Sequence, residues 1–196
     1  MNLESWRHFA RARFFEFVRR PERALEEYHV AVAINPRLVK CWAHIAYILA
    51  KQGRFAEAEH HFLEAHRLAP QDFGILFNLG YVRNELKQHA KAVEAFREVV
   101  KLKPVFDTAW YGMGLAHAAL GEHPAAVEAF EQAARLQPMA SPVWYQLGMA
   151  CHHAREPERV HTIIHHLNRF DPKTARRLIL DTGSTDLAYL VKDLVV

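Results

Sequence analysis

The stretch that decides the fold is residues 107–140, which read DTAWYGMGLAHAALGEHPAAVEAFEQAARLQPMA. Its proline, Pro138, belongs to a series of prolines that recur every 34 residues through the chain. The series consists of Pro36, Pro70, Pro104, Pro138 and Pro172. Four equal intervals without a slip do not arise by chance, so the chain is an array of internal repeats.

On this grid the chain divides into five repeats, 5–38, 39–72, 73–106, 107–140 and 141–174. Four positions of the repeat agree in residue type. The fourth position is large, the eighth and twentieth are small, and the twenty-fourth is an aromatic ring in four of the five repeats. In residues 107–140 these four positions hold Trp110, Gly114, Ala126 and Phe130.

The pattern W…G…A…F…P in 34 residues resembles the tetratricopeptide repeat (TPR) over about 170 of the 196 residues. The resemblance implies an all-α fold, a right-handed superhelix or α-solenoid of about ten antiparallel helices with a C-terminal capping helix. The residues explain why: small side chains let paired helices approach closely, and Gly53 and Gly121 can end a helix in the left-handed conformation. Proline marks the junction between repeats because it lacks an N–H and clashes with a preceding turn.

The two ends of the array depart from the pattern. Repeat 1 has His8 and Arg11 where tryptophan and leucine are expected, and repeat 5 has Val160 at a small position. Terminal repeats are commonly atypical because one of their faces has no neighbouring repeat. We therefore assign residues 1–174 to the array and residues 175–196 to a capping helix and tail.

The C-terminal segment carries a second apolar pattern. Leu187, Leu190, Val191 and Leu194 recur at intervals of three and four, which predicts a short helix with one apolar face. Such a helix can cover the last repeat, since stacked repeats need a terminal cover. It can also act as a self-peptide that docks into the groove of its own chain or of a neighbour.

The resemblance also implies where a partner binds, because first helices line the concave face in this family. Aromatic side chains with amides and a few cations occupy those positions, and such side chains are enriched at protein interfaces. The candidates are Phe9, Arg13, Lys40, His44, Tyr47, Phe77, Asn78, Tyr81, Asn84, Tyr111, Tyr145, Gln146, Met149 and His152. Equivalent positions hold Trp6, Phe17, Lys51 and Thr108.

One known way of binding, the clamp that chaperone-binding TPRs place on a C-terminal carboxylate, does not match. Its five positions hold Ala43, Tyr47, Asn78, Thr108 and Gly112, of which Asn78 alone fits. We expect instead a scaffold or adaptor that binds a peptide or helix of a protein partner in the concave groove. The alternatives are self-assembly as a homo-oligomer through the apolar tail, or a regulatory TPR domain of a larger enzyme.

Other chemistry is not predicted. No nucleotide-binding loop, nucleophile motif or carboxylate pair is present, so we expect no enzyme activity and no cofactor. His161 and His165 have a metal-compatible spacing, but no Cys or carboxylate completes a known motif, so no metal site is expected. Cys41 and Cys151 lie three repeats apart and are expected to be packing residues.

Charge and hydropathy limit the partners further. The net charge is +3, and glutamates dilute the arginine clusters at both ends, so nucleic acid is not the expected partner. No run of 18 apolar residues or signal-peptide core occurs, so we expect no membrane insertion and a cytoplasmic protein.

Overall fold

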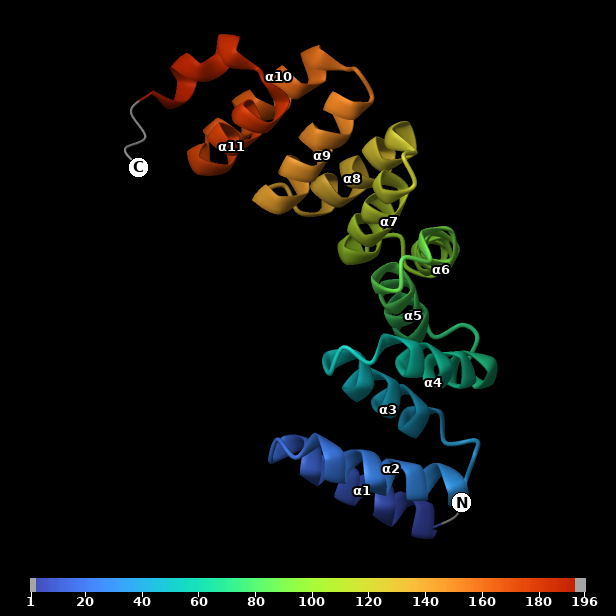
Figure 1. Ribbon diagram of the computed structural model, residues 1–196. Helices are drawn as coiled ribbons and strands as arrows, with labels where there is room; N and C mark the ends of the chain where they lie inside the picture. The colour runs from blue at the N-terminus through green and yellow to red at the C-terminus, as the bar shows by residue number, and fades with distance from the viewer. Residues whose placement is uncertain (1–2, 193–196) are drawn as a thin grey trace. The chain divides into compact units, whose positions relative to one another are not determined.

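The computed structural model describes residues 3–192, and these residues fold almost entirely into helices (Figure 1). The all-α prediction is confirmed. The helices are α1 (Leu3–Phe17), α2 (Pro21–Ile34), α3 (Val39–Lys51), α4 (Phe55–Leu68), α5 (Phe73–Glu85), α6 (His89–Leu102), α7 (Asp107–Ala119), α8 (His123–Leu136), α9 (Ser141–His153), α10 (Pro157–Asn168), α11 (Pro172–Thr182) and the 3₁₀ helix η1 (Thr185–Val191).

The helices form two compact units, the first ending at Leu102 and the second beginning at Lys103. In the first unit, α1 packs on α2, α3 on α4 and α5 on α6, and each pair joins the next through α2–α3 and α4–α5 contacts. The second unit repeats this arrangement with α7–α8 and α9–α10, and α11 packs on both α9 and α10. Each unit has its own apolar core.

Close approach of the paired helices depends on the glycines of the eighth position. A Cβ atom on Gly114 would lie 2.6 Å from the ring of Phe130, and one on Gly80 would lie 2.9 Å from Phe96. In repeat 5 the neighbour is different, because a Cβ on Gly148 would meet Leu178 of α11 at 2.5 Å. Leu178 thus fills a space that an aromatic ring fills elsewhere.

The turn within each repeat contains one residue in the left-handed conformation. Gly53 and Gly121 have φ of 75° and 76°, whereas Arg19, Lys87 and Arg155 adopt 55° to 62° at the equivalent position. In every case the next residue's N–H donates to a carbonyl five residues earlier, which closes the end of the first helix. The backbone therefore imposes this conformation even where the sequence supplies no glycine.

The tryptophans of the fourth position do more than fill space. Trp42, Trp110 and Trp144 each donate their indole N–H, at 2.8 Å, to the carbonyl of the proline six residues earlier. The bond ties the start of each first helix to the preceding inter-repeat junction. Leu76 holds the same position in repeat 3 and has no polar atom to form it.

The C-terminal segment covers the second unit's core. Leu187 and Val191 of η1 are buried with residues of α10 and α11, so these two side chains pack within their own chain. The segment forms a 3₁₀ helix up to Val191, and the predicted Leu194 lies outside the described residues. Helix α11 begins at Pro172, before the predicted end of repeat 5.

Candidate functional site

Side chains from α1, α3 and α5 line a hollow of about 300 Å³ in the first unit. Four of the predicted groove residues meet here, and they are joined by Glu16 and Ala43. The four are Arg13 of α1, His44 and Tyr47 of α3, and Asn78 of α5. The structure therefore brings together residues that are up to 65 positions apart in the sequence.

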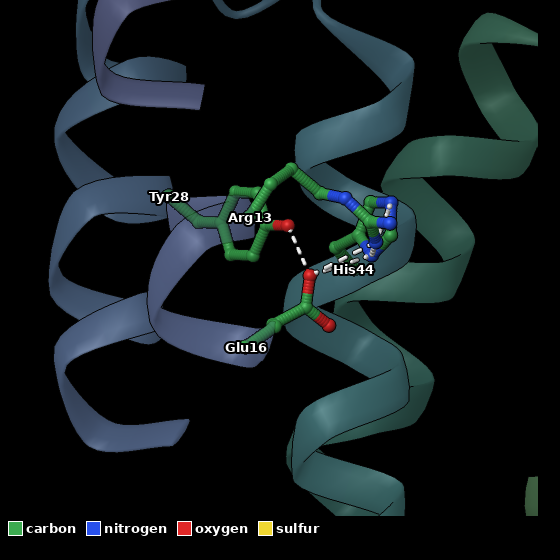
Figure 2. A network of polar contacts seen from close by, with 4 residues as sticks. All are labelled: Arg13, Glu16, Tyr28 and His44. Atoms are coloured by element: carbon green, nitrogen blue, oxygen red, sulfur yellow. Dashed lines mark hydrogen bonds and ion pairs between the residues drawn. The ribbon is translucent and has the colours of Figure 1, made fainter. Parts of the chain in front are cut away.

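The carboxylate of Glu16 is the centre of a polar network (Figure 2). Its Oε2 accepts a hydrogen bond of 2.5 Å from the hydroxyl of Tyr28 and lies 3.1 Å from Nη1 of Arg13. The same oxygen lies 3.3 Å from Nδ1 of His44. Three neighbours thus satisfy one carboxylate oxygen at the floor of the hollow.

The ring of His44 is held on two sides. It stacks on Tyr28, with 5.3 Å between ring centroids and 8° between planes, and the edge of Phe9 approaches at 5.9 Å. Burial lowers the pKa of His44, the Arg13 and Lys40 charges act in the same direction, and Glu16 opposes them. A neutral His44 can donate from Nδ1 to Glu16, and Nη1 of Arg13 lies 3.4 Å from both ring nitrogens of His44.

A larger hollow of about 550 Å³ adjoins the first one and shares Glu16 and Tyr47 with it. Its other walls are Arg19 and Pro21, from the turn after α1 and the start of α2, and Ile48, Lys51 and Gln52 at the end of α3. Tyr47 stands between the two hollows with 45% of its surface exposed. The ammonium of Lys51 lies 5.4 Å from the centre of the Tyr47 ring.

The remaining candidates in the first unit differ in how much they offer a partner. Tyr81 is 45% exposed, with its ring edge against Phe55, and Lys40 is exposed. Phe77 is half-buried against Phe96, and the side chain of Asn84 bonds His89 at 2.7 Å. Tyr81 and Lys40 are thus accessible, whereas Phe77 and Asn84 are largely occupied by neighbours.

In the second unit the candidates do not share one surface. Tyr145, Gln146 and Met149 line a hollow of about 350 Å³, whereas His152 lines another of about 340 Å³. Two residues of α11 already contact Tyr145. Its hydroxyl donates a hydrogen bond of 2.6 Å to Asp181, and the Arg177 guanidinium lies 4.5 Å from the centre of its ring. Tyr111 packs on Phe130, and burial raises its pKa.

Sequence reasoning did not single out Glu16 as a groove residue, although it organises the network. The signal was present, because Glu16 occupies the twelfth position of repeat 1, which faces the groove in this family. Arg19 belongs to the N-terminal arginine cluster of the sequence, and its place in the hollow depends on the left-handed turn after α1. The 34-residue spacing places Arg19 at the position of Gly53 and Gly121 and so predicts the turn, but only the structure shows that the side chain lines the hollow.

Both cysteines are buried, and His161 is close to a carboxylate. Burial raises the pKa of the Cys41 thiol to about 12 and that of Cys151 to about 11, so both thiols are protonated at neutral pH. His161 lies 3.5 Å from Asp186. Within residues 3–192 no three metal-ligating side chains gather at one point, and none of the helices there is long and apolar enough to cross a membrane.

Repeated helical hairpins of this kind define an α-solenoid repeat protein. Two profiles, both described as tetratricopeptide repeat, match residues 45–105 and 108–140. Residues 45–105 and 108–140 are therefore tetratricopeptide repeats, and the fold of the chain is that of solved tetratricopeptide repeat structures. A comparison with curated protein sequences finds no match.

Solved structures share the fold at low sequence identity. The MamA protein aligns over 100% of this chain and 99% of its own, with a TM-score of 0.81 and 16% identity. YrrB, described as a TPR protein with an unusual peptide-binding site, aligns over 90% of each chain with a TM-score of 0.81 and 19% identity. The pilF protein of Pseudomonas aeruginosa covers 91% of this chain and 82% of its own, with a TM-score of 0.73 and 21% identity.

Proposed function

We propose that the chain is a non-catalytic interaction scaffold that holds a peptide or helix of a protein partner against α1, α3 and α5. The observation that carries the proposal is the row of accessible side chains beside two adjoining hollows. Tyr47 lines both hollows, Tyr81 belongs to α5, which contributes Asn78 to one of them, and each tyrosine is 45% exposed. Exposed tyrosines beside a hollow are typical anchors for a partner, since they combine apolar area with one hydrogen-bonding group.

The polar network favours binding over catalysis. Glu16, Tyr28, Arg13 and His44 satisfy one another, and no serine, threonine or cysteine nucleophile adjoins His44 among the residues that line the hollow. A site for nucleophilic catalysis would instead place a nucleophile within hydrogen-bond reach of such a histidine. Proteins of this family are generally non-catalytic, and YrrB is described as binding a peptide, which supports the same conclusion.

In this proposal residues 5–174 form five repeats, and residues 175–196 form a cap and tail. The first unit supplies the main binding surface, and the second unit supplies a lesser one, where Gln146 and Met149 remain on the wall of a hollow. We further propose a cytoplasmic location and a protein partner. Tyr145 is a weaker anchor than Tyr47, because α11 already uses its hydroxyl group.

The test is a selection from a displayed library of peptides of about 12 residues, a length that spans roughly 40 Å when extended. Binding of a selected peptide is then measured by calorimetry. The double variant Tyr47→Ala, Tyr81→Ala should bind it at least about tenfold more weakly. The control, Tyr189→Ala, removes an exposed tyrosine from η1 and should bind like the wild type. Equal affinity of all three proteins would overturn the groove assignment.

A further inference from the structure

Cations surround the two hollows of the first unit. Arg13 belongs to α1, Arg19 to the turn that follows it, and Lys51 to the end of α3. Lys40 of α3 lies close enough to His44 for its charge to lower that residue's pKa. Positively charged groups thus approach the binding surface from two helices and one turn.

The carboxylate that lines both hollows is already neutralised. Glu16 is the one carboxylate among the residues that line the two hollows, and its Oε2 is bound by Tyr28, Arg13 and His44. The charge of Arg13 therefore balances that of Glu16. Among the described residues, Arg19 and Lys51 remain at the larger hollow without an ion-pair partner, and Glu22, which accepts a hydrogen bond of 3.3 Å from Gln52 on its wall, pairs with neither of them.

Some exposed cations of the same unit have acidic partners, whereas others, such as Lys91 and Arg97 of α6, form no ion pair within residues 3–192. Arg54 pairs with Glu57, Arg67 with Glu64 and Lys101 with Glu98, all three residues apart along the chain. Arg19, Lys40 and Lys51 also form no ion pair with a carboxylate in that part of the chain, and they differ from the other unpaired cations in lying beside the hollows. The groove has cations whose counter-charge the protein does not supply.

The larger hollow suits two neighbouring side chains of a partner, one acidic and one apolar. Its volume of about 550 Å³ exceeds that of a single side chain, Ile48 contributes a buried apolar wall, and the Tyr47 ring stands at its edge. Arg19 can bind both oxygens of a carboxylate, and Lys51 can add a point charge from above the tyrosine ring.

We propose that the partner segment is acidic, and that an aspartate or glutamate of it binds between Arg19 and Lys51 beside an apolar residue that contacts Tyr47. This inference rests on the proposed function, since it specifies the chemistry of the segment that the groove holds. It does not need a free C-terminal carboxylate, because the groups involved can bind a carboxylate side chain anywhere along a peptide.

The experiment repeats the peptide selection with three forms of the full chain: the wild type, Arg19→Gln with Lys51→Gln, and a matched control. The control is Lys91→Gln with Arg97→Gln, which removes two exposed charges from α6, away from both hollows. The wild type and the control should select peptides rich in aspartate and glutamate. The groove variant should lose that enrichment, while circular dichroism shows the same helix content for all three proteins.

Calorimetry then measures how much the acidic side chain of the peptide contributes to binding. Replacing the selected peptide's acidic residue by its amide should weaken binding to the wild type about tenfold, and should change binding to the groove variant much less. Wild-type affinity should also fall as NaCl rises from about 50 to about 300 mM, because screening weakens exposed charge pairs. A loss on amidation that is equally large for both proteins would overturn the placement between Arg19 and Lys51.

Two failures can be told apart. Peptides that bind the wild type and need Tyr47, but show no acidic enrichment, would overturn this inference and leave the proposed function intact. A selection that returns no peptide dependent on Tyr47 and Tyr81 would overturn the proposed function itself, and this inference with it.

Discussion

Acid should destabilise the first unit because His61 of α4 is partly buried, where the protonated ring is less stable than in water. Its ring stacks on Trp42, at 5.5 Å and 28°, and lies 5.5 Å from the ring of His29 of α2. Its Nδ1 is buried without a hydrogen-bond partner among the described residues. Burial lowers the pKa of His61 to about 4, and the charges of His29, His60 and Arg54 act in the same direction, opposed by that of Glu57.

The sign and size of the effect follow from the difference between folded and unfolded chains. The His61 ring has a pKa near 6.5 in the unfolded chain and about 4 in the folded chain. Between these two pH values the unfolded chain binds a proton at His61 and the folded chain does not. Stability is therefore complete above about pH 6.5 and falls as the pH drops toward 4. Between about pH 7.5 and pH 5 the loss amounts to roughly 2 kcal/mol. His29, whose pKa burial also lowers, adds to the loss with the same sign.

The assay measures unfolding by urea at several pH values and constant ionic strength, with amide hydrogen exchange of α4 as a local readout. His61→Gln should be less stable than the wild type near neutral pH but should lose about 2 kcal/mol less between about pH 7.5 and pH 5. His165→Gln, the same change at an exposed site on α10, should follow the wild type. Parallel pH curves for His61→Gln and the wild type would refute the reasoning.

Three further predictions concern the repeat itself. Trp110→Phe should cost about 1–2 kcal/mol by removing the bond to the Pro104 carbonyl, measured by thermal unfolding, whereas a cost near zero would show that the bond contributes nothing. Lys87→Gly should stabilise the chain by about 0.5–1 kcal/mol, because Lys87 adopts a φ of 61°, which glycine tolerates better. The control Lys91→Gly, inside α6, should destabilise the chain by about 1 kcal/mol. A change of the same sign in both variants would contradict the prediction. Phe17→Ser should change stability by less than about 0.5 kcal/mol, since Phe17 is 85% exposed, and a larger loss in urea unfolding would show a contact on that face of α1.

Much of the candidate site was predictable because the repeat fixes which positions face the groove. Arg13, His44, Tyr47 and Asn78 hold positions that the family resemblance predicts to face the groove, and they line one hollow. Position cannot tell whether a side chain is already engaged. Tyr145 has the same position as Phe77, but its hydroxyl is bonded by Asp181, which lies beyond the last repeat.

The sequence by itself determined the helix-pair fold, because small residues, aromatic rings and prolines recur at a fixed spacing that one helical hairpin satisfies. Only the tertiary structure decided which carboxylate is neutralised, which cations lack partners and which tyrosines remain exposed. Glu16 reaches Tyr28 and His44 across 12 and 28 residues of sequence, and Leu178 fills a space over Gly148 from another helix. The physical reason is that helix propensity and periodicity are local, whereas charge compensation and exposure depend on atoms that folding brings together.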